Sequence, residues 1–300
     1  MILQRMYGRI YLQTTDWKLY SWLKNKDFDQ LSLNNVTDEG TKMNEEEKYL
    51  FDLRGYLSID RALDNHQLQA LNDIWDQHIK DECSVNDTTR RFGQLLEWGQ
   101  PFIDLIDNPS ITPYLEVILG HQFRLDHIYA DLIRSGNSPI GSRLHGGGTP
   151  FDPCQFYKFH GGKMYNGLTV VAYNLADVGP GDGGFGCVPG SHKSNLDFPV
   201  DWKDMDEGLH PCVSRVTGSA GTAVIFTEAL THGALPWVGL GERRTIFFKY
   251  SPNPISWSPR YFDEEDFEGL TDRQRFILEP PNARPSNRKT KPKTQRKKTA

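Results

Sequence analysis

The sequence predicts a mainly β fold of the α+β class, an antiparallel sandwich or jelly roll with helices packed on its outside. The expected helices all lie within residues 45–119. After Gly120, short β-favoured runs alternate with Gly- and Pro-rich turns. Strands and helices do not alternate regularly after that point, which disfavours a parallel doubly wound sheet. Helices followed by short strands with long loops therefore favour an antiparallel β-structure with external helices.

The first half of the chain supplies the helices. Helical patterns cover four segments, at 45–54, 64–80, 102–107 and 111–119. The second is the clearest, because after a capping residue, Asp64 or Asn65, apolar residues recur every three or four positions: Leu68, Leu71, Trp75 and Ile79. Gly120 is a natural end for the fourth helix. Between the first two helices, residues 55–59 alternate like a strand.

The second half of the chain supplies the strands. β-favoured runs occur at 123–132, 168–175, 222–227 and 245–250. We expect them to belong to one domain, residues 43–280. The polar residues 1–42 form an expected amino-terminal extension. Residues 281–300 carry eight Lys and Arg and only Ala as an apolar type, so we expect a disordered basic tail.

Composition limits the class of protein. Of 300 residues, 37% are hydrophobic, and no apolar run reaches the ~18 residues of a membrane helix. Without the tail, 26 basic residues oppose 39 acidic ones, a net charge of −13, which disfavours a nucleic-acid enzyme. Four cysteines without a C-x-x-C pair, and an amino terminus without a signal-peptide core, predict a cytoplasmic location.

Two motifs match known chemistry only formally. Residues 179–184 fit G-x-G-x-x-G, but the chain continues with glycines and a proline rather than a helix, so a sheet turn is the better interpretation. Ser191 directly precedes His192 without a G-x-S-x-G elbow, and neighbouring side chains of an extended chain point apart. A dinucleotide-binding enzyme and a serine hydrolase are therefore poorly supported.

The histidines are the most informative residues. His145 ends a strand-like region and begins a run of three glycines, and His232 follows the buried run 222–227. Arg243 lies eleven residues after His232, immediately before another strand. Neutral imidazoles bind iron or zinc, and an arginine can hold a carboxylate through two hydrogen bonds. From the residues alone, a metal site and a set of locally hydrogen-bonded histidines fit equally well.

Three segments together resemble the phytanoyl-CoA dioxygenase-like family of iron(II)- and 2-oxoglutarate-dependent oxygenases. They are residues 53–57 with the helix after them, the run 183–193 with its Pro-Gly-Ser-His-Lys signature, and residues 221–245. The resemblance extends from about Tyr49 to Pro252. It implies a double-stranded β-helix, which is a cupin-like jelly roll, with iron(II) and 2-oxoglutarate as cofactor and co-substrate and a small molecule as substrate.

The family pattern carries over residue by residue with one departure. His145 matches the first metal-binding His, and His232 matches the distal one. Arg243 matches the Arg that pairs with the far carboxylate of 2-oxoglutarate, and Arg244 is the adjacent alternative. Where the family has Asp or Glu two residues after the first His, this chain has Gly147. The position is filled by an acid from elsewhere, stays open for water or chloride as in related iron-dependent halogenases, or reflects lost iron binding.

Candidates for the missing acid are Asp152, Asp182 and Glu228. Glu228 lies four residues before His232, which is ~13 Å in a regular strand, so these two could share a metal only if the chain turns sharply between them. Chloride would preserve the charge that the missing carboxylate would supply.

Three further expectations complete the predicted site. Tyr173, in the middle of a strand, lines the co-substrate pocket or belongs to the core. His160 precedes two glycines and is a rival to His145. The glycine loops at 146–148 and 161–162 are expected to act as lids. The predicted activity is hydroxylation of a small molecule, and the alternatives are halogenation and a non-catalytic binding protein.

Overall fold

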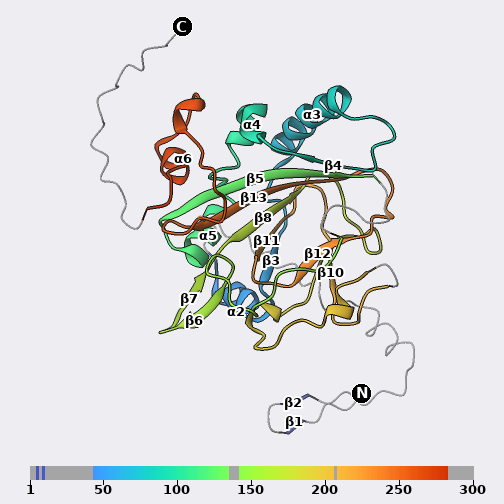
Figure 1. Ribbon diagram of the computed structural model, residues 1–300, viewed down its shortest axis with the longest axis vertical. Helices are drawn as coiled ribbons and strands as arrows, with labels where there is room; N and C mark the ends of the chain where they lie inside the picture. Colours follow the sequence, from blue (N-terminus) through green and yellow to red (C-terminus); the bar gives the residue numbers. More distant parts are fainter. Residues whose placement is uncertain (1–4, 7–8, 11–42, 135–141, 206–207, 283–300) are drawn as a thin grey trace. The chain divides into compact units, whose positions relative to one another are not determined.

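A computed structural model of the chain describes residues 5–6, 9–10, 43–134, 142–205 and 208–282 (Figure 1). The chain divides into two units, residues 1–36 and 37–300. In the first unit, β1 (Arg5–Met6) and β2 (Arg9–Ile10) pair antiparallel. The predicted extension and the predicted disorder of the basic tail fall largely outside the described residues.

A six-stranded antiparallel sheet forms the centre of the second unit. Its order is β3 (Tyr56–Ile59), β11 (Ala223–Thr227), β8 (Thr169–Asn174), β13 (Arg243–Pro252), β5 (Phe123–Ile133) and β4 (Thr89–Phe92). Every residue of β8 and β11 is buried, as expected for central strands. Five of these strands lie where the sequence predicts them; β4 was not predicted.

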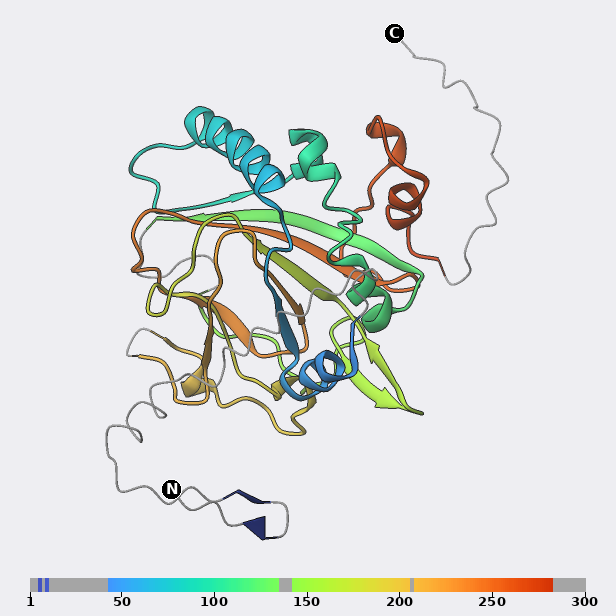
Figure 2. The same cartoon turned by 180° about the vertical axis from the view of Figure 1, so that it is seen from behind.

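A three-stranded antiparallel sheet packs against the first. Its order is β10 (Ser214–Val216), β9 (Gly184–Cys187) and β12 (His232–Leu235). The two sheets share an apolar cluster, in which the rings of Phe185 and Phe226 lie 4.5 Å apart. Figure 1 shows β10 and β12 on one side of the large sheet, and Figure 2 shows the same layers from behind. We call the space between the two sheets the lumen.

Helices cover the other face of the large sheet and its ends, as predicted. They are α2 (Glu45–Arg54), α3 (Asn65–Glu82), α4 (Gln100–Ile103), α5 (Thr112–Leu119) and α6 (Asp272–Ile277). Capping boxes begin α2 at Asn44 and α3 at Asp64, and Gly120 ends α5 at a positive φ of 90°. None of the helices in these described ranges is long and apolar enough to span a membrane.

Short elements join these layers. The hairpin of β6 (Tyr157–His160) and β7 (Lys163–Asn166) projects from the domain, and its turn is Gly161-Gly162, with φ of 58° and 75°. This left-handed geometry favours glycine. The 3₁₀ helices are η1 (Leu95–Trp98), η2 (Ser191–Lys193), η3 (Val200–Trp202) and η4 (Glu264–Asp266).

Alternation along β13 decides which side chains enter the lumen. Ile246 and Phe248 belong to the apolar core on the helix side, whereas Phe247 belongs to the cluster between the sheets. Because successive residues of a strand point to opposite faces, Arg243 and Lys249 share the lumen face with Phe247.

Candidate functional site

The fold places His145 beside His232, at the edge of the small sheet. Each backbone N–H donates to the carbonyl of the other residue, at 2.9 Å and 2.8 Å, which forms an antiparallel bridge. The centroids of the two rings are 4.3 Å apart. His232 is buried and His145 is exposed, so the pair lies where the lumen meets the surface.

Both imidazoles are fixed in the same way. Nδ1 of His145 lies 2.9 Å from the carbonyl oxygen of Arg143, and Nδ1 of His232 lies 2.7 Å from that of Leu230. A carbonyl only accepts hydrogen bonds, so each Nδ1 donates and each Nε2 keeps its lone pair. Metal-binding histidines are typically oriented by such a bond from the other ring nitrogen. The pair therefore fits the requirements of a metal site.

Glu228 is the acid that the chain brings to this pair. After β11 the chain turns, with the N–H of Leu230 donating to the carbonyl of Thr227 at 2.9 Å. The turn places Oε2 of Glu228 3.9 Å from Nε2 of His232, although the two residues are four positions apart. Lys249, on the lumen face of β13, donates to the other oxygen, Oε1.

The other two candidate acids serve local turns. Oδ1 of Asp152 accepts from the backbone N–H groups of Cys154 at 2.6 Å and Gln155 at 2.9 Å. Oδ2 of Asp182 accepts from the N–H of Gly179 at 2.7 Å, within the sheet turn that the sequence predicts at 179–184. In the described ranges, no three His, Cys, Asp or Glu side chains already lie close enough to share one ion. The site is a histidine pair with one carboxylate nearby.

Burial and charge set the protonation of these groups. Burial would raise the pKa of Glu228, but Lys249, His232 and His145 outweigh it and lower the pKa to about 2. Burial lowers the pKa of His232 to about 4, although Glu228 opposes the shift. At neutral pH the carboxylate is therefore ionised and the imidazole is neutral, the forms that bind a metal.

Arg243 is a buried cation at the start of β13. It is 4% exposed, and burial lowers its pKa to about 10, although Asp131 and Tyr129 oppose the shift. Its Nε has no hydrogen-bond partner within the described residues. Asp131 is engaged elsewhere, because Arg91 donates to both of its oxygens at 2.7 Å and 2.8 Å. Such an arginine is suited to an anionic ligand.

Arg244 does not share this environment. It points to the helix side, where its guanidinium lies 3.0 Å from Oδ1 of Asn72 and 2.7 Å from Oδ1 of Asp76 on α3. Glu242 completes its set of partners at 2.9 Å. Strand alternation thus separates the two arginines that the sequence left as alternatives.

Two other expected residues are not brought to the histidine pair. Tyr173 faces the helix-side core, where its ring meets that of Phe248 edge to face at 6.3 Å, so the alternative of a core residue fits and a pocket-lining role does not. His160 is exposed at the end of the β6–β7 hairpin. The glycines after it form the turn of that hairpin rather than a lid over the site.

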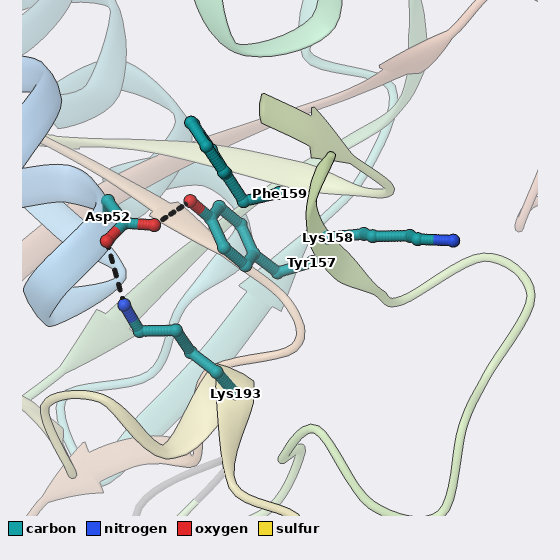
Figure 3. A pocket seen from close by; sticks show the side chains of 5 residues that line it. All are labelled: Asp52, Tyr157, Lys158, Phe159 and Lys193. Atoms are coloured by element: carbon teal, nitrogen blue, oxygen red, sulfur yellow. Dashed lines mark hydrogen bonds and ion pairs between the residues drawn. The ribbon is translucent and has the colours of Figure 1, made fainter. Parts of the chain in front are cut away.

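The Pro-Gly-Ser-His-Lys run is hydrogen-bonded both to the turn before His232 and to the end of α2. Oγ of Ser191 accepts from the N–H of Thr231 at 2.7 Å, next to His232. His192 donates from Nε2 to the carbonyl of Asp52 at 3.0 Å. Lys193 donates to the Asp52 carboxylate at 2.9 Å, as Figure 3 shows. The run therefore connects the end of α2 to the turn that precedes His232.

The Asp52 carboxylate also accepts from the hydroxyl of Tyr157, so it lies between this tyrosine and Lys193 (Figure 3). Together with Lys158 and Phe159, these residues line a pocket of about 330 Å³.

A second pocket is lined by residues that are close in sequence to the two histidines, although neither histidine lines it. Its volume is about 450 Å³, and it is bordered by Gly147, two residues after His145, and by Thr231, which precedes His232. Apolar side chains form much of the remaining wall: Val188, Leu196, Phe198 and Trp202. A pocket of this size and lining suits a small molecule.

Residues 142–245 match the sequence profile of the family described as Phytanoyl-CoA dioxygenase (PhyH). This part of the chain therefore resembles that family. The matched span contains His145, His232 and Arg243. Proteins with curated descriptions include none that is significantly similar to it.

Solved structures share the fold of this chain. HygX from Streptomyces hygroscopicus with iron bound is 26% identical, with a TM-score of 0.61 over 77% of this chain and 95% of that one. HygX with nickel and 2-oxoglutarate bound is 24% identical, with a TM-score of 0.65 over 76% and 94%. The epimerase SnoN in complex with Fe³⁺, alpha ketoglutarate and nogalamycin RO is 16% identical, with a TM-score of 0.50 over 69% and 82%. The predicted mainly β jelly-roll class is confirmed.

One residue of the candidate site was not predicted from the sequence. Lys249 stands on the lumen face of β13 and holds Glu228. Strand alternation from Arg243 would have placed it on that face, but nothing in the sequence indicated its partner.

Proposed function

We propose that the chain is an iron(II)- and 2-oxoglutarate-dependent oxygenase that hydroxylates a small molecule. His145 and His232 are its metal ligands, and Arg243 binds the far carboxylate of 2-oxoglutarate. The observation that carries this proposal is the histidine pair, in which both Nδ1 atoms are held by carbonyls, so that each Nε2 keeps its lone pair. The similar HygX structures, one with iron bound and one with nickel and 2-oxoglutarate bound, support it.

In this proposal the protein residues position the reactants. Iron held by the two histidines would supply the activation of dioxygen: one oxygen atom would convert 2-oxoglutarate to succinate and carbon dioxide, and the other would enter a C–H bond of the substrate. Arg243 orients the co-substrate from the lumen. Phe226, whose ring is 4.8 Å from that of His232, and Phe185, at 5.9 Å, exclude water from the inner side. The 450 Å³ pocket beside Gly147 holds the substrate.

Halogenation is the second candidate, and position 147 favours it. Gly147 has a φ of +122°, and a Cβ built on it would lie 3.2 Å from Oγ1 of Thr231. A side chain there is strained, so no carboxylate is expected from this position. With chloride at the open place, the C–H bond of the substrate would break and a C–Cl bond would form. The second oxygen atom of dioxygen would then leave as water, with the hydrogen from the substrate and one proton.

Anaerobic titration with iron(II) and 2-oxoglutarate tests the proposal. We expect a weak visible charge-transfer absorption, and on admission of oxygen we expect release of succinate. His232→Ala should abolish both signals, whereas His160→Ala, on the exposed hairpin, should keep them. A wild-type protein with neither visible absorption nor bound iron would show that the proposed activity is wrong.

Substrate turnover in the presence of chloride separates the two reactions. Mass spectrometry distinguishes a hydroxylated from a chlorinated product. Hydroxylation with chloride present supports the first candidate, and a chlorinated product that is lost in Gly147→Asp supports the second.

A further inference from the structure

We infer that Glu228 supplies the carboxylate of the metal site in place of the acid that is missing at position 147. This inference rests on the proposed function, because it assigns a third ligand to the site that His145 and His232 would form. Glu228 lies outside the usual position in the sequence, on the turn between β11 and β12 rather than beside the first histidine.

The geometry of the turn supports this role. Oε2 of Glu228 and Nε2 of His232 are 3.9 Å apart. Two ligand atoms at right angles around one ion, each about 2.1 Å from it, are about 3 Å apart. A side-chain movement of roughly 1 Å therefore suffices for Glu228 and His232 to share an ion. The turn itself is held on both sides, since the N–H of Glu228 donates to the carbonyl of Leu168 at 2.9 Å.

The alternatives within the described residues are weaker. Gly147 has the left-handed φ noted above, which strains any side chain, and a Cβ there would lie only 3.2 Å from Oγ1 of Thr231. Asp152 and Asp182 hold turns through their own carboxylates. Glu228 is the candidate acid that the fold directs at a histidine.

Lys249 gives Glu228 a defined orientation. It holds Oε1 and leaves Oε2 towards His232. Both side chains are largely buried, at 12% and 6% exposed. A buried ion pair of this kind seldom stabilises a fold more than an apolar pair of similar volume would. The ion pair is instead explained if Lys249 positions the Glu228 carboxylate as a metal ligand and balances its charge before the metal binds.

Metal affinity in the absence of 2-oxoglutarate tests the inference. The probe is Mn(II), titrated under argon and followed by the electron paramagnetic resonance of the free ion. The variants are Glu228→Gln, Lys249→Met and, as a matched control, Asp152→Asn, whose amide oxygen can keep the local turn. Circular dichroism and urea unfolding establish that each variant is folded.

We expect Glu228→Gln to weaken Mn(II) binding by at least about 10-fold, the lower end of losses seen when even an indirect partner of a metal is removed. Asp152→Asn should bind like the wild type. Lys249→Met should retain most of the affinity, because the carboxylate is still present, whereas a merely structural ion pair predicts equal losses in Lys249→Met and Glu228→Gln.

The double variant Glu228→Gln, Lys249→Met covers the case in which Glu228→Gln alone fails to fold. It removes both charges together, and it should bind Mn(II) as weakly as Glu228→Gln. If the wild type binds Mn(II), and folded Glu228→Gln or the folded double variant binds it with the same affinity, Glu228 is not a metal ligand. The proposed function is not affected by that result. A wild type that binds no metal overturns the proposed function and this inference with it.

Discussion

Replacing Arg243 by methionine should make the protein more stable and less able to bind 2-oxoglutarate. The arginine is buried, its Nε has no hydrogen-bond partner within the described residues, and burial lowers its pKa to about 10. A buried donor without a partner costs about 1–3 kcal/mol, which Arg243→Met removes while keeping a side chain of similar length. For a domain of this size, each kcal/mol shifts the melting temperature by about 2–4 °C.

The same substitution removes the expected partner of the co-substrate. A hydrogen bond to a charged group contributes about 1.5–3 kcal/mol, so the affinity for 2-oxoglutarate should fall by about 10- to 150-fold. Thermal unfolding measured with and without Mn(II) and 2-oxoglutarate, under argon, reports both effects. The apoprotein of Arg243→Met should melt several degrees higher than the wild type, and it should gain less from added 2-oxoglutarate.

Arg244→Met is the matched control. This guanidinium bonds to Asn72, Asp76 and Glu242 on the helix side. Its loss should lower the free energy of unfolding by about 1 kcal/mol or less and leave the affinity for 2-oxoglutarate unchanged. A destabilised Arg243→Met, or one with unaltered 2-oxoglutarate affinity, would refute the assignment of Arg243 to an anionic ligand.

Three further predictions concern the frame of the site. Gly147→Asp should lower the urea-derived free energy of unfolding by about 1–3 kcal/mol, because of its positive φ and the contact with Thr231; an unchanged value would show that the loop relaxes. Burial lowers the pKa of His192 to about 4, so on acidification the unfolded chain takes up this proton before the folded chain does. The free energy of unfolding should therefore decrease as the pH falls from about 6.5 to about 4, and it should decrease less steeply in His192→Gln. Burial would raise the pKa of Asp52, but the hydrogen bond from Lys193 helps to lower it. At this partly exposed site the ionised Asp52 contributes about 1 kcal/mol or less to stability. That contribution is present above about pH 4 and is lost as the pH falls through the lowered pKa. Asp52→Asn should flatten that acid limb of the stability profile, and an unaltered limb would assign it to other carboxylates.

Local sequence signals predicted the elements that are locally determined. Capping residues and apolar spacing predicted α3 to within about two residues, because both signals act within one or two turns. β9 and β12 were missed, since Gly-Phe-Gly-Cys and His-Gly-Ala-Leu have little strand propensity of their own. They are strands because they pair with each other, and such pairing cannot be inferred from either segment alone.

The same distinction applies to the site. The choice of Arg243 over Arg244 follows from strand alternation once the register of β13 is known. The position of Glu228 depends on a turn closed by Thr227 and on a hydrogen bond to Leu168, sixty residues earlier. From the sequence spacing alone, we could say only that a sharp turn between residues 228 and 232 would be needed to bring this acid to His232.

The charges of the lumen predict that metal and co-substrate bind cooperatively. Arg91 pairs with Asp131 and Lys249 pairs with Glu228, so with Arg243 these five side chains carry a net charge of +1. A divalent metal and the 2-oxoglutarate dianion together leave this net charge unchanged, whereas either one alone shifts it by two units in a poorly screened interior.

Each ligand should therefore raise the affinity for the other, and by the same factor, since the coupling free energy is reciprocal. Titration of 2-oxoglutarate with and without Mn(II), and of Mn(II) with and without 2-oxoglutarate, measures that factor from both directions. Two affinities that are independent of each other would mean that the ligands occupy separate places, and the lumen between His232 and Arg243 would then not be a common site.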